Sequence, residues 1–324
     1  METEKTREAV RRTVGERPEE VEEIDEGLIH ETYSVKVDGR ELIVQFSGDE
    51  EDSSSLEHNI RCYELFQDTV PVPEPLTEQV ETLEGKKFIV VENLPGETAE
   101  SDITPEKTLE AGKALAKIHD KASFPHEGWM DLKQEDSTPE ELLEGLELHR
   151  FEKGSLRRRK LDNMYSKKIP TLRENGFEVA EEVEGFLREN ESLFPKEFTA
   201  VPVHIDFSPD NVLFQEEKLT GVIDFDYMYA GLDVRDLAKS ANSFWMHDPD
   251  ADWNIRQKFY KGYRKIRELP ENFEELEAFF RIETLARLIA SVIELDEMTE
   301  EEIEFYQGEL KEELEKSKKK LENT

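Results

Sequence analysis

The sequence predicts an α+β chain of two lobes, a small N-terminal lobe built on an antiparallel sheet and a larger, mainly helical C-terminal lobe. Three observations lead to this prediction. The chain has 324 residues, which is long for one small domain. Extended apolar runs dominate residues 1–100, whereas helix signals dominate the rest. The turn Leu94-Pro95-Gly96 separates the two parts, so we expect a sheet-based lobe at 1–95 and a helical lobe at 96–324.

The N-terminal lobe contains one strong hairpin signal. Two extended runs in ETYSVKVDGRELIVQFS flank the turn Asp38-Gly39. A helix is expected in SSSLEHNIRCYELFQ, because its apolar residues have helical spacing. These residues are Leu56, Ile60, Tyr63 and Phe66. The prolines of TVPVPEPL exclude a helix there, and KKFIVVENLPGE predicts a strand that ends at the turn.

The C-terminal lobe begins with two helices marked by N-terminal caps. Thr104 followed by Pro105 predicts the start of the first. Thr138 and Glu141 form a capping box for the second. The stretch EFTAVPVHIDFSPDNVLFQEEKLTGVIDFDYMYAG is the later β region, which we expect to contain two short strands linked by a turn. From Asp233 onward the patterns are helical.

The charge balance excludes several classes of partner. The chain has 42 basic and 78 acidic residues, a formal net charge of −36, which repels nucleic acid and anionic membranes. A solvated acidic surface explains this charge, but we favour adaptation to a salt-rich cytoplasm. Cys62 is the only cysteine, so no disulfide framework or cysteine-based metal site is expected within the chain. The sequence shows neither an apolar signal core nor a membrane span, so we expect a cytoplasmic protein.

Polar residues gather after two apolar runs of the later β region. The first group is His204-x-Asp206-x₄-Asn211, and the second begins at Asp224 after Gly221-Val222-Ile223. This spacing matches an arrangement used for phosphoryl transfer. An aspartate accepts the proton of the attacking hydroxyl, while amide and carboxylate oxygens suit Mg²⁺, which is a hard cation. The two groups are therefore expected to form one active site.

These motifs resemble those of the aminoglycoside phosphotransferase and choline kinase superfamily, the small-molecule relatives of protein kinases. HIDFSPDN is similar to the family's HGDxxxxN, with Ile205 in place of the usual glycine. IDFDYMYAGLDVRDLA is similar to its second motif, including the downstream Asp236-Leu237-Ala238. GLIHETYSV, VPVPEPL, VVENLPGE and ALAKIH resemble, more weakly, the nucleotide loop, the entry to the hinge, the hinge and a conserved helix. The resemblance covers residues 25–245 in order.

The resemblance implies a two-lobed protein-kinase-like fold, ATP as phosphate donor and Mg²⁺ as cofactor. Residues 1–95 would then be the nucleotide-binding lobe, and residues 96–324 the helical catalytic and substrate lobe. Asp206 would be the catalytic base, and His204 would brace its loop. Asn211 and Asp224 would bind the metal. Further roles are implied for residues outside these two motifs. These are Glu92, Asn93 and Leu94 at the adenine, Asp236 as helix cap and support of the catalytic loop, and Asp226 at a second ion or the substrate.

The third strand departs from the family pattern. ELIVQFS places Gln45 where the family usually has Lys or Arg, whose partner on the following helix would be Glu57. A glutamine amide can donate to a phosphate oxygen, but without charge. The expected function is ATP- and Mg²⁺-dependent phosphorylation of a small-molecule hydroxyl, such as that of an amino alcohol, a sugar or an aminoglycoside. The alternatives are a nucleotide-binding pseudokinase that acts as a scaffold and a metal-dependent hydrolase.

Several of these residues also have simpler interpretations. His204 alone would be a core histidine, and Asp206 and Asn211 alone would be turn residues. For Asp226 the functional and the structural interpretations have equal weight. His119 and Asp120 are expected to close a helix, and His30 to lie in a loop, rather than to bind ligand. The basic segment 148–168 is either a solvated helix face or a site for an anionic group, and we predict the second.

Overall fold

The computed structural model describes residues 2–24, 30–47, 54–132, 138–151, 154–295 and 298–323. The chain forms two compact units. The first contains Met1–Ser101, Met130–Glu147 and Asp210–Met228. The second contains Asp102–Trp129, Leu148–Pro209 and Tyr229–Thr324. This division differs from a single boundary near residue 95, because the chain returns to the first unit twice.

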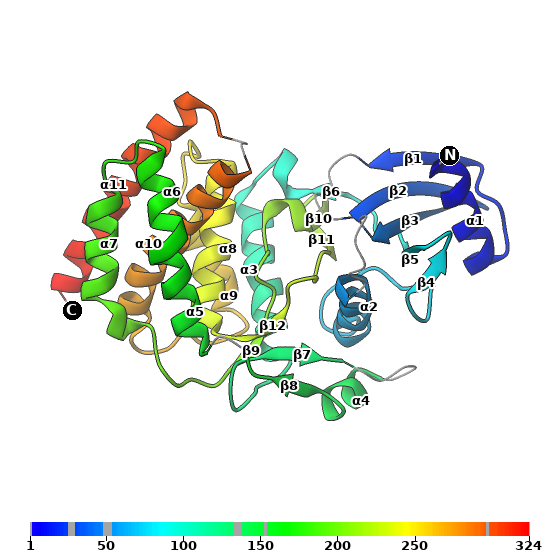
Figure 1. Ribbon diagram of the computed structural model, residues 1–324, viewed down its shortest axis with the longest axis horizontal. Helices are drawn as coiled ribbons and strands as arrows, with labels where there is room; N and C mark the ends of the chain where they lie inside the picture. The colour runs from blue at the N-terminus through cyan, green and yellow to red at the C-terminus, as the bar shows by residue number, and fades with distance from the viewer. Residues whose placement is uncertain are drawn as a thin grey trace. The chain divides into compact units, whose positions relative to one another are not determined.

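The first unit is built on a five-stranded antiparallel sheet of strand order β1-β2-β3-β5-β4 (Figure 1). Its strands are β1 Glu20–Ile24, β2 His30–Val37, β3 Arg40–Ser47, β4 Glu81–Leu83 and β5 Lys86–Glu92. The predicted hairpin is confirmed as β2–β3, with positive φ at Asp38 (48°) and Gly39 (74°). Such a pair of positive φ angles matches the right-handed twist of a hairpin.

Helix α1, Glu2–Val14, covers one face of this sheet, whereas the sequence predicted mostly strands in this part of the chain. The helix is short of large apolar residues, yet Ala9 and Val10 are fully buried against strand residues such as Val44 and Phe46. The spacing of apolar residues does not predict α1, because few of them lie on its buried face. The helix is stabilised by packing of that face against the sheet. The predicted helix after the third strand is confirmed as α2, Ser54–Phe66, and α4 is Pro139–Glu144.

A second sheet draws residues 210–228 into the first unit. Strand β10, Val212–Gln215, pairs with β11, Lys218–Val222, and with β6, Glu97–Thr98. Short 3₁₀ turns lie beside it, η1 at Ala99–Ser101 and η4 at Pro209–Asn211. The pairing of Leu213 with Thr98 explains why the first unit extends beyond residue 95. The later β region therefore has four short strands in the described residues 198–231, not two.

The other two strands of that region belong to the second unit. Strand β9, Val201–Val203, pairs antiparallel with β12, Tyr229–Gly231, so that Tyr229 lies opposite Val203. Two further short strands lie where the chain passes between units, β7 at Trp129–Asp131 and β8 at Glu147–His149.

Helices make up most of the second unit, as predicted. They are α3 Pro105–Asp120, α5 Leu156–Asn163, the π-helical turn η2 Met164–Lys168, α6 Ile169–Glu174, α7 Ala180–Glu189, the 3₁₀ turn η3 Glu191–Leu193, α8 Asp233–His247, α9 Ile255–Tyr263, α10 Phe273–Glu294 and α11 Glu300–Glu322. The long α10 contacts α6, α7, α8 and α11 (Figure 1). The predicted caps at Thr104 and Thr138 are confirmed, each accepting a backbone hydrogen bond. None of the described helices is long and apolar enough to cross a membrane.

Candidate active site

The second unit holds Asp206 on a loop that follows the buried strand β9. His204 and Ile205 connect β9 to Asp206. Their backbone N–H groups donate to the Asp236 carboxylate at 3.0 and 3.1 Å. Ile205 has φ 72°, a left-handed conformation that is costly for a β-branched residue. The hydrogen bonds from both residues to Asp236 hold this strained turn in place.

Asp236 supports the loop as predicted, but it does not cap the helix. It lies in the first turn of α8, where Asp233 instead accepts a backbone hydrogen bond from Val234 at 2.7 Å. His119 Nε2 is 3.1 Å from Asp236, and its Nδ1 is 2.8 Å from the Tyr263 hydroxyl. A buried carboxylate can only accept, so His119 donates from Nε2 and accepts from Tyr263 at Nδ1. His119 is therefore a structural residue at the end of α3, as expected.

Lys239 is the cationic neighbour of Asp206, and the sequence analysis missed it. Its Nζ lies 3.2 Å from Asp206 Oδ1 and also donates to the Ile205 carbonyl. Burial opposes ionisation of Asp206, but the charge and hydrogen bond of Lys239, together with His204, hold its pKa below the ordinary value. Asp206 is therefore a carboxylate near neutral pH. The sequence feature that could have indicated Lys239 is its position three residues after Asp236 on α8. This spacing places Lys239 and Asp236 on one face of the helix.

His204 is fully buried and packs its ring edge-to-face against Phe207, with 5.5 Å between ring centroids. This placement fits the predicted bracing role, since a ring with no exposed surface has no access to a substrate.

The first unit holds Asn211 and Asp224 side by side on the β10–β11 hairpin. Val212 pairs with Val222, and the Ile223 N–H donates to the Asn211 carbonyl at 3.0 Å. Asp224 follows directly and has φ 61°, a conformation uncommon outside glycine. An amide oxygen and a carboxylate on adjoining backbone segments are a donor set that suits Mg²⁺.

Helix α2 anchors the segment that follows Asp224. Asn59 Oδ1 accepts the Phe225 N–H at 3.1 Å, and the Phe225 ring stacks on Phe66 with centroids 5.4 Å apart. Asp226 Oδ2 lies 2.8 Å from His30 Nε2, which is also 3.3 Å from the Ser55 hydroxyl. His30 thus lies at the start of β2 and holds Asp226, a role that was not predicted. Residues 27–29 of the stretch GLIHETYSV, which was expected to form the nucleotide loop, lie outside the described residues.

Gln45 and Glu57 are not brought together by the structure. Gln45 is half-buried on β3, and its Oε1 has no hydrogen-bond partner among the described residues. Glu57 is exposed on α2, and no hydrogen bond or ion pair between these two described residues is present. On this helix it is Asn59 that reaches the Asp224 segment.

The expected hinge residues follow strand β5. The Glu92 N–H donates to the Glu74 carbonyl at 2.9 Å, and the Asn93 N–H donates to the Glu41 carbonyl at 3.0 Å. These two N–H groups are therefore engaged within the protein. In the described part of the chain the Leu94 N–H has no such partner, which makes Leu94 the best placed of the three to donate to a purine.

The basic segment is largely neutralised by acidic groups of the second unit. Arg157 donates to the Glu191 carbonyl, Arg158 pairs with Asp162, and Lys167 and Lys168 pair with Glu294. Lys153 lies outside the described residues. The expectation that this segment as a whole binds an anion is therefore not supported for these four residues.

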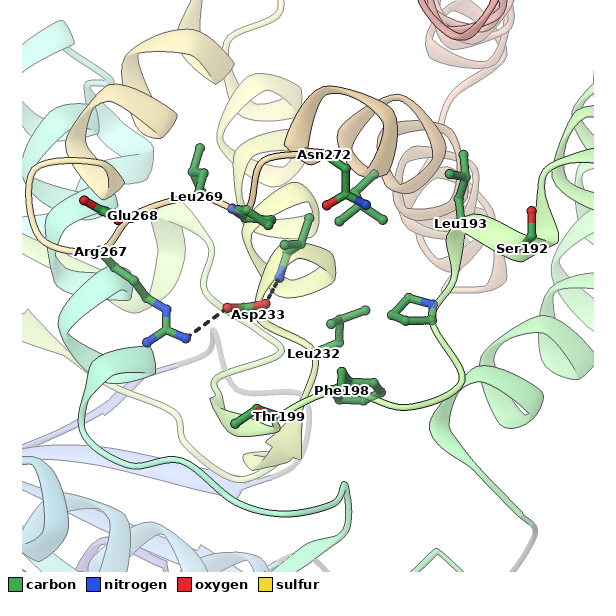
Figure 2. A pocket seen from close by; sticks show the side chains of 14 residues that line it. Ser192, Leu193, Phe198, Thr199, Leu232, Asp233, Arg267, Glu268, Leu269 and Asn272 are labelled. Carbon is green, nitrogen blue, oxygen red and sulfur yellow. Dashed lines mark hydrogen bonds and ion pairs between the residues drawn. The ribbon is translucent and has the colours of Figure 1, made fainter. Parts of the chain in front are cut away.

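The second unit also contains a cavity of about 520 Å³ (Figure 2). Apolar side chains such as Phe198, Leu232 and Leu269 line it together with the ion pair between Arg267 and Asp233, at 3.2 Å. None of the predicted site residues is part of this lining, so we do not assign the cavity to catalysis.

A model of the phosphotransferase enzyme family matches residues 20–276. Homoserine kinase of Beijerinckia indica is 37% identical over 93 residues, covering 28% of this chain and 27% of the relative. Homoserine kinase of Phenylobacterium zucineum is 27% identical over 211 residues, covering 64% of this chain and 57% of the relative. The matched part thus spans less than two thirds of either relative.

Solved structures share the fold at low sequence identity. A spectinomycin phosphotransferase in complex with ADP and spectinomycin has a TM-score of 0.61 and 16% identity, with 97% of this chain and 98% of that chain covered. An aminoglycoside phosphotransferase in ternary complex with ADP and hygromycin B has a TM-score of 0.63 and 13% identity, with 95% and 97% covered. These likenesses support the predicted kinase-like fold.

Proposed function

Because the chain belongs to the phosphotransferase enzyme family, we propose that it transfers the γ-phosphoryl group of ATP to a hydroxyl of a small molecule. The observation that carries this proposal is the state of Asp206. Lys239 holds its carboxylate ionised, and Asp236 fixes the loop that presents it. A fixed, partly exposed carboxylate of this kind can orient a hydroxyl and accept its proton.

In the proposed reaction the acceptor hydroxyl oxygen forms a bond to the γ-phosphorus of ATP. The bond between this phosphorus and the β–γ bridging oxygen breaks, and ADP leaves with that electron pair. The hydroxyl proton passes to Asp206. Asn211 and Asp224 supply oxygen ligands for Mg²⁺, whose charge offsets that of the phosphates when it is bound. The remaining contribution of the protein is positioning and electrostatic stabilisation.

The open face of the five-stranded sheet is the proposed nucleotide site of the first unit. Leu42, Val44 and Phe46 of β3 are buried with α1, so the alternate residues Ile43 and Gln45 point to the other face. Ile43 would contact the purine, and the Gln45 amide would donate to a phosphate oxygen.

We propose L-homoserine as the acceptor. The homoserine kinases similar to this chain support it, whereas the aminoglycoside phosphotransferases share only the fold. Homoserine offers one primary hydroxyl on a short chain that ends in an ammonium and a carboxylate.

A panel assay tests this proposal. ADP release from ATP is measured with L-homoserine, choline, ethanolamine, a hexose and an aminoglycoside, with and without Mg²⁺. We expect Mg²⁺-dependent ADP release above the acceptor-free rate with L-homoserine. Binding of ATP without transfer to any acceptor would instead identify a nucleotide-binding scaffold, for which the missing cation at Gln45 is the supporting feature.

A further inference from the structure

In the part of the chain that the structure describes, Lys160, on helix α5 of the second unit, has no acidic partner. Its basic neighbours Arg157, Arg158, Lys167 and Lys168 each have one, whereas Arg159 lies over the Phe151 ring. In the described part of the chain no carboxylate lies within ion-pair distance of the Lys160 ammonium, which instead lies 5.6 Å from the centroid of the Tyr229 ring. An ammonium that is enclosed without a counterion lowers the stability of the folded protein. Such a residue therefore needs an explanation in terms of function.

The surroundings of Lys160 are positively charged. Burial lowers its pKa well below the ordinary value, and the nearby Arg235 and Arg287 lower it further. The acid of this region, Glu283, already pairs with Arg235 at 3.0 Å and Arg287 at 2.8 Å. Lys160 as a residue is half-buried rather than fully buried. An anion is the ligand that this excess of positive charge favours.

The position of Lys160 connects it to the catalytic loop within the same unit. Tyr229, which its ammonium faces, lies opposite Val203 in the β9–β12 pair, and Val203 precedes the loop that carries Asp206. Lys239, which contacts Asp206, is also among the cations that act on Lys160. Lys160 and Asp206 thus share one electrostatic environment.

The aromatic residues next to Lys160 are already engaged by cations of the protein. Trp129, Phe151 and Tyr229 contact one another edge-to-face, with ring centroids 5.3–5.7 Å apart. The Arg159 guanidinium lies 4.3 Å from the centroid of the Phe151 ring, and the Lys160 ammonium lies over the Tyr229 ring. A cluster of rings can bind a quaternary ammonium, but here a cationic group would meet like charges.

We propose that Lys160 binds the carboxylate of the acceptor and so selects an amino-acid alcohol over a purely cationic one. This inference rests on the proposed kinase function and deepens it. The phosphorylated hydroxyl is at the opposite end of such an acceptor, near Asp206. The stability lost by enclosing the unpaired ammonium is recovered when the carboxylate binds.

Calorimetric titration of the protein saturated with ADP tests the proposal without requiring turnover. The ligands are L-homoserine and 3-aminopropan-1-ol, which has the same hydroxyl and amine but no carboxylate. Lys160→Met should weaken binding of L-homoserine by about 10- to 100-fold, the range of a charge-assisted hydrogen bond. It should leave binding of 3-aminopropan-1-ol within about 2-fold, since that ligand makes no contact with Lys160.

Arg158→Gln is the matched control, because Arg158 is exposed on the same helix and pairs with Asp162. It should leave both affinities unchanged. The melting temperature of ligand-free Lys160→Met should equal or exceed that of the wild type, because the change removes an unpaired ammonium and keeps the backbone carbonyl that accepts from Arg287. If Lys160→Met instead lowers the melting temperature and reduces the affinity for both ligands equally, Lys160 has a structural role and the proposal is wrong.

The same variants separate this inference from the proposed function. If wild-type protein phosphorylates 3-aminopropan-1-ol or an aminoglycoside better than L-homoserine, the kinase function stands and the role of Lys160 is wrong. If no acceptor is phosphorylated, but wild-type protein binds L-homoserine and Lys160→Met binds it more weakly, the proposed binding site is correct and the proposed kinase function is wrong.

Discussion

At the scale of single residues, the site depends on how Asp206 is held. Its loop includes Ile205 in a left-handed conformation, at the position of the glycine in the motif HGDxxxxN that this stretch resembles. The bonds from His204 and Ile205 to Asp236 offset this strain. The motif spacing predicted Asp206, Asn211 and Asp224 as site residues, because phosphoryl transfer requires residues of these types in this order. Their roles stay predictions. Lys239 could not be assigned, since its contact depends on how α8 packs beside the loop.

The pH dependence of turnover should report the contact between Lys239 and Asp206. Activity requires the Asp206 carboxylate, whose pKa is lowered in the folded protein, so activity is lost only as the pH falls through that low value. In Lys239→Met burial acts unopposed by this cation and raises the pKa. The acid limb of kcat/KM should then move to higher pH by about one unit.

The control for this measurement is Lys261→Met, which removes an exposed lysine of α9 in the same unit. It should leave the acid limb in place. An acid limb that is identical in wild type and Lys239→Met would show that the group limiting activity at low pH is not Asp206.

At the scale of elements, close packing of α3 and α9 requires glycine on both helices. A Cβ at Gly262 would lie 2.1 Å from the Leu109 carbonyl oxygen, and one at Gly112 would lie 2.2 Å from the Phe259 carbonyl oxygen. This packing places His119, on α3, against Tyr263, on α9, and so fixes the support of Asp236. Helix α3 was predictable from its cap at Thr104, but its packing partner was not, because helix contacts depend on the tertiary fold.

Gly262→Ala should therefore destabilise the protein by several kcal/mol, since the obstructing atoms are backbone and cannot rotate away. Gly308→Ala is the matched control, because Gly308 is exposed on helix α11 and a Cβ there would meet no atom within 4 Å apart from the neighbouring backbone of that helix. It should stabilise the protein by about 0.5–1 kcal/mol. Chemical unfolding of the two variants measures the difference. Equal effects would show that α3 and α9 do not approach as described.

At the scale of the whole molecule, the predicted mixture of a sheet-based part and a helical part is confirmed. The sequence could not show that residues 210–228 belong to the same unit as the N-terminal sheet. That assignment arises from the pairing of β10 with β6, which joins residues more than 100 positions apart. The proposed ligands of Mg²⁺ thus belong to the first unit, and the proposed base belongs to the second.

The net charge of −36 should make stability depend on salt. Screening shortens the range of repulsion between carboxylates from roughly 30 Å at 0.01 M salt to about 3 Å at 1 M. The melting temperature should therefore rise with KCl across this range. The rise should be smaller near pH 4.5, where many exposed carboxylates are protonated. A melting temperature independent of KCl at neutral pH would contradict adaptation to a salt-rich cytoplasm.

Mass spectrometry of the acceptor after incubation with ATP and Mg²⁺ tests the central claim most directly, with wild-type protein and Asp206→Asn compared at equal nucleotide saturation. The account predicts O-phosphohomoserine from wild-type protein. It predicts at least a 100-fold lower rate from Asp206→Asn, because the amide cannot accept the hydroxyl proton. ATP affinity should be nearly unchanged, since Asp206 lies outside the proposed nucleotide site. Phosphorylated product at a near-normal rate from Asp206→Asn would contradict the account.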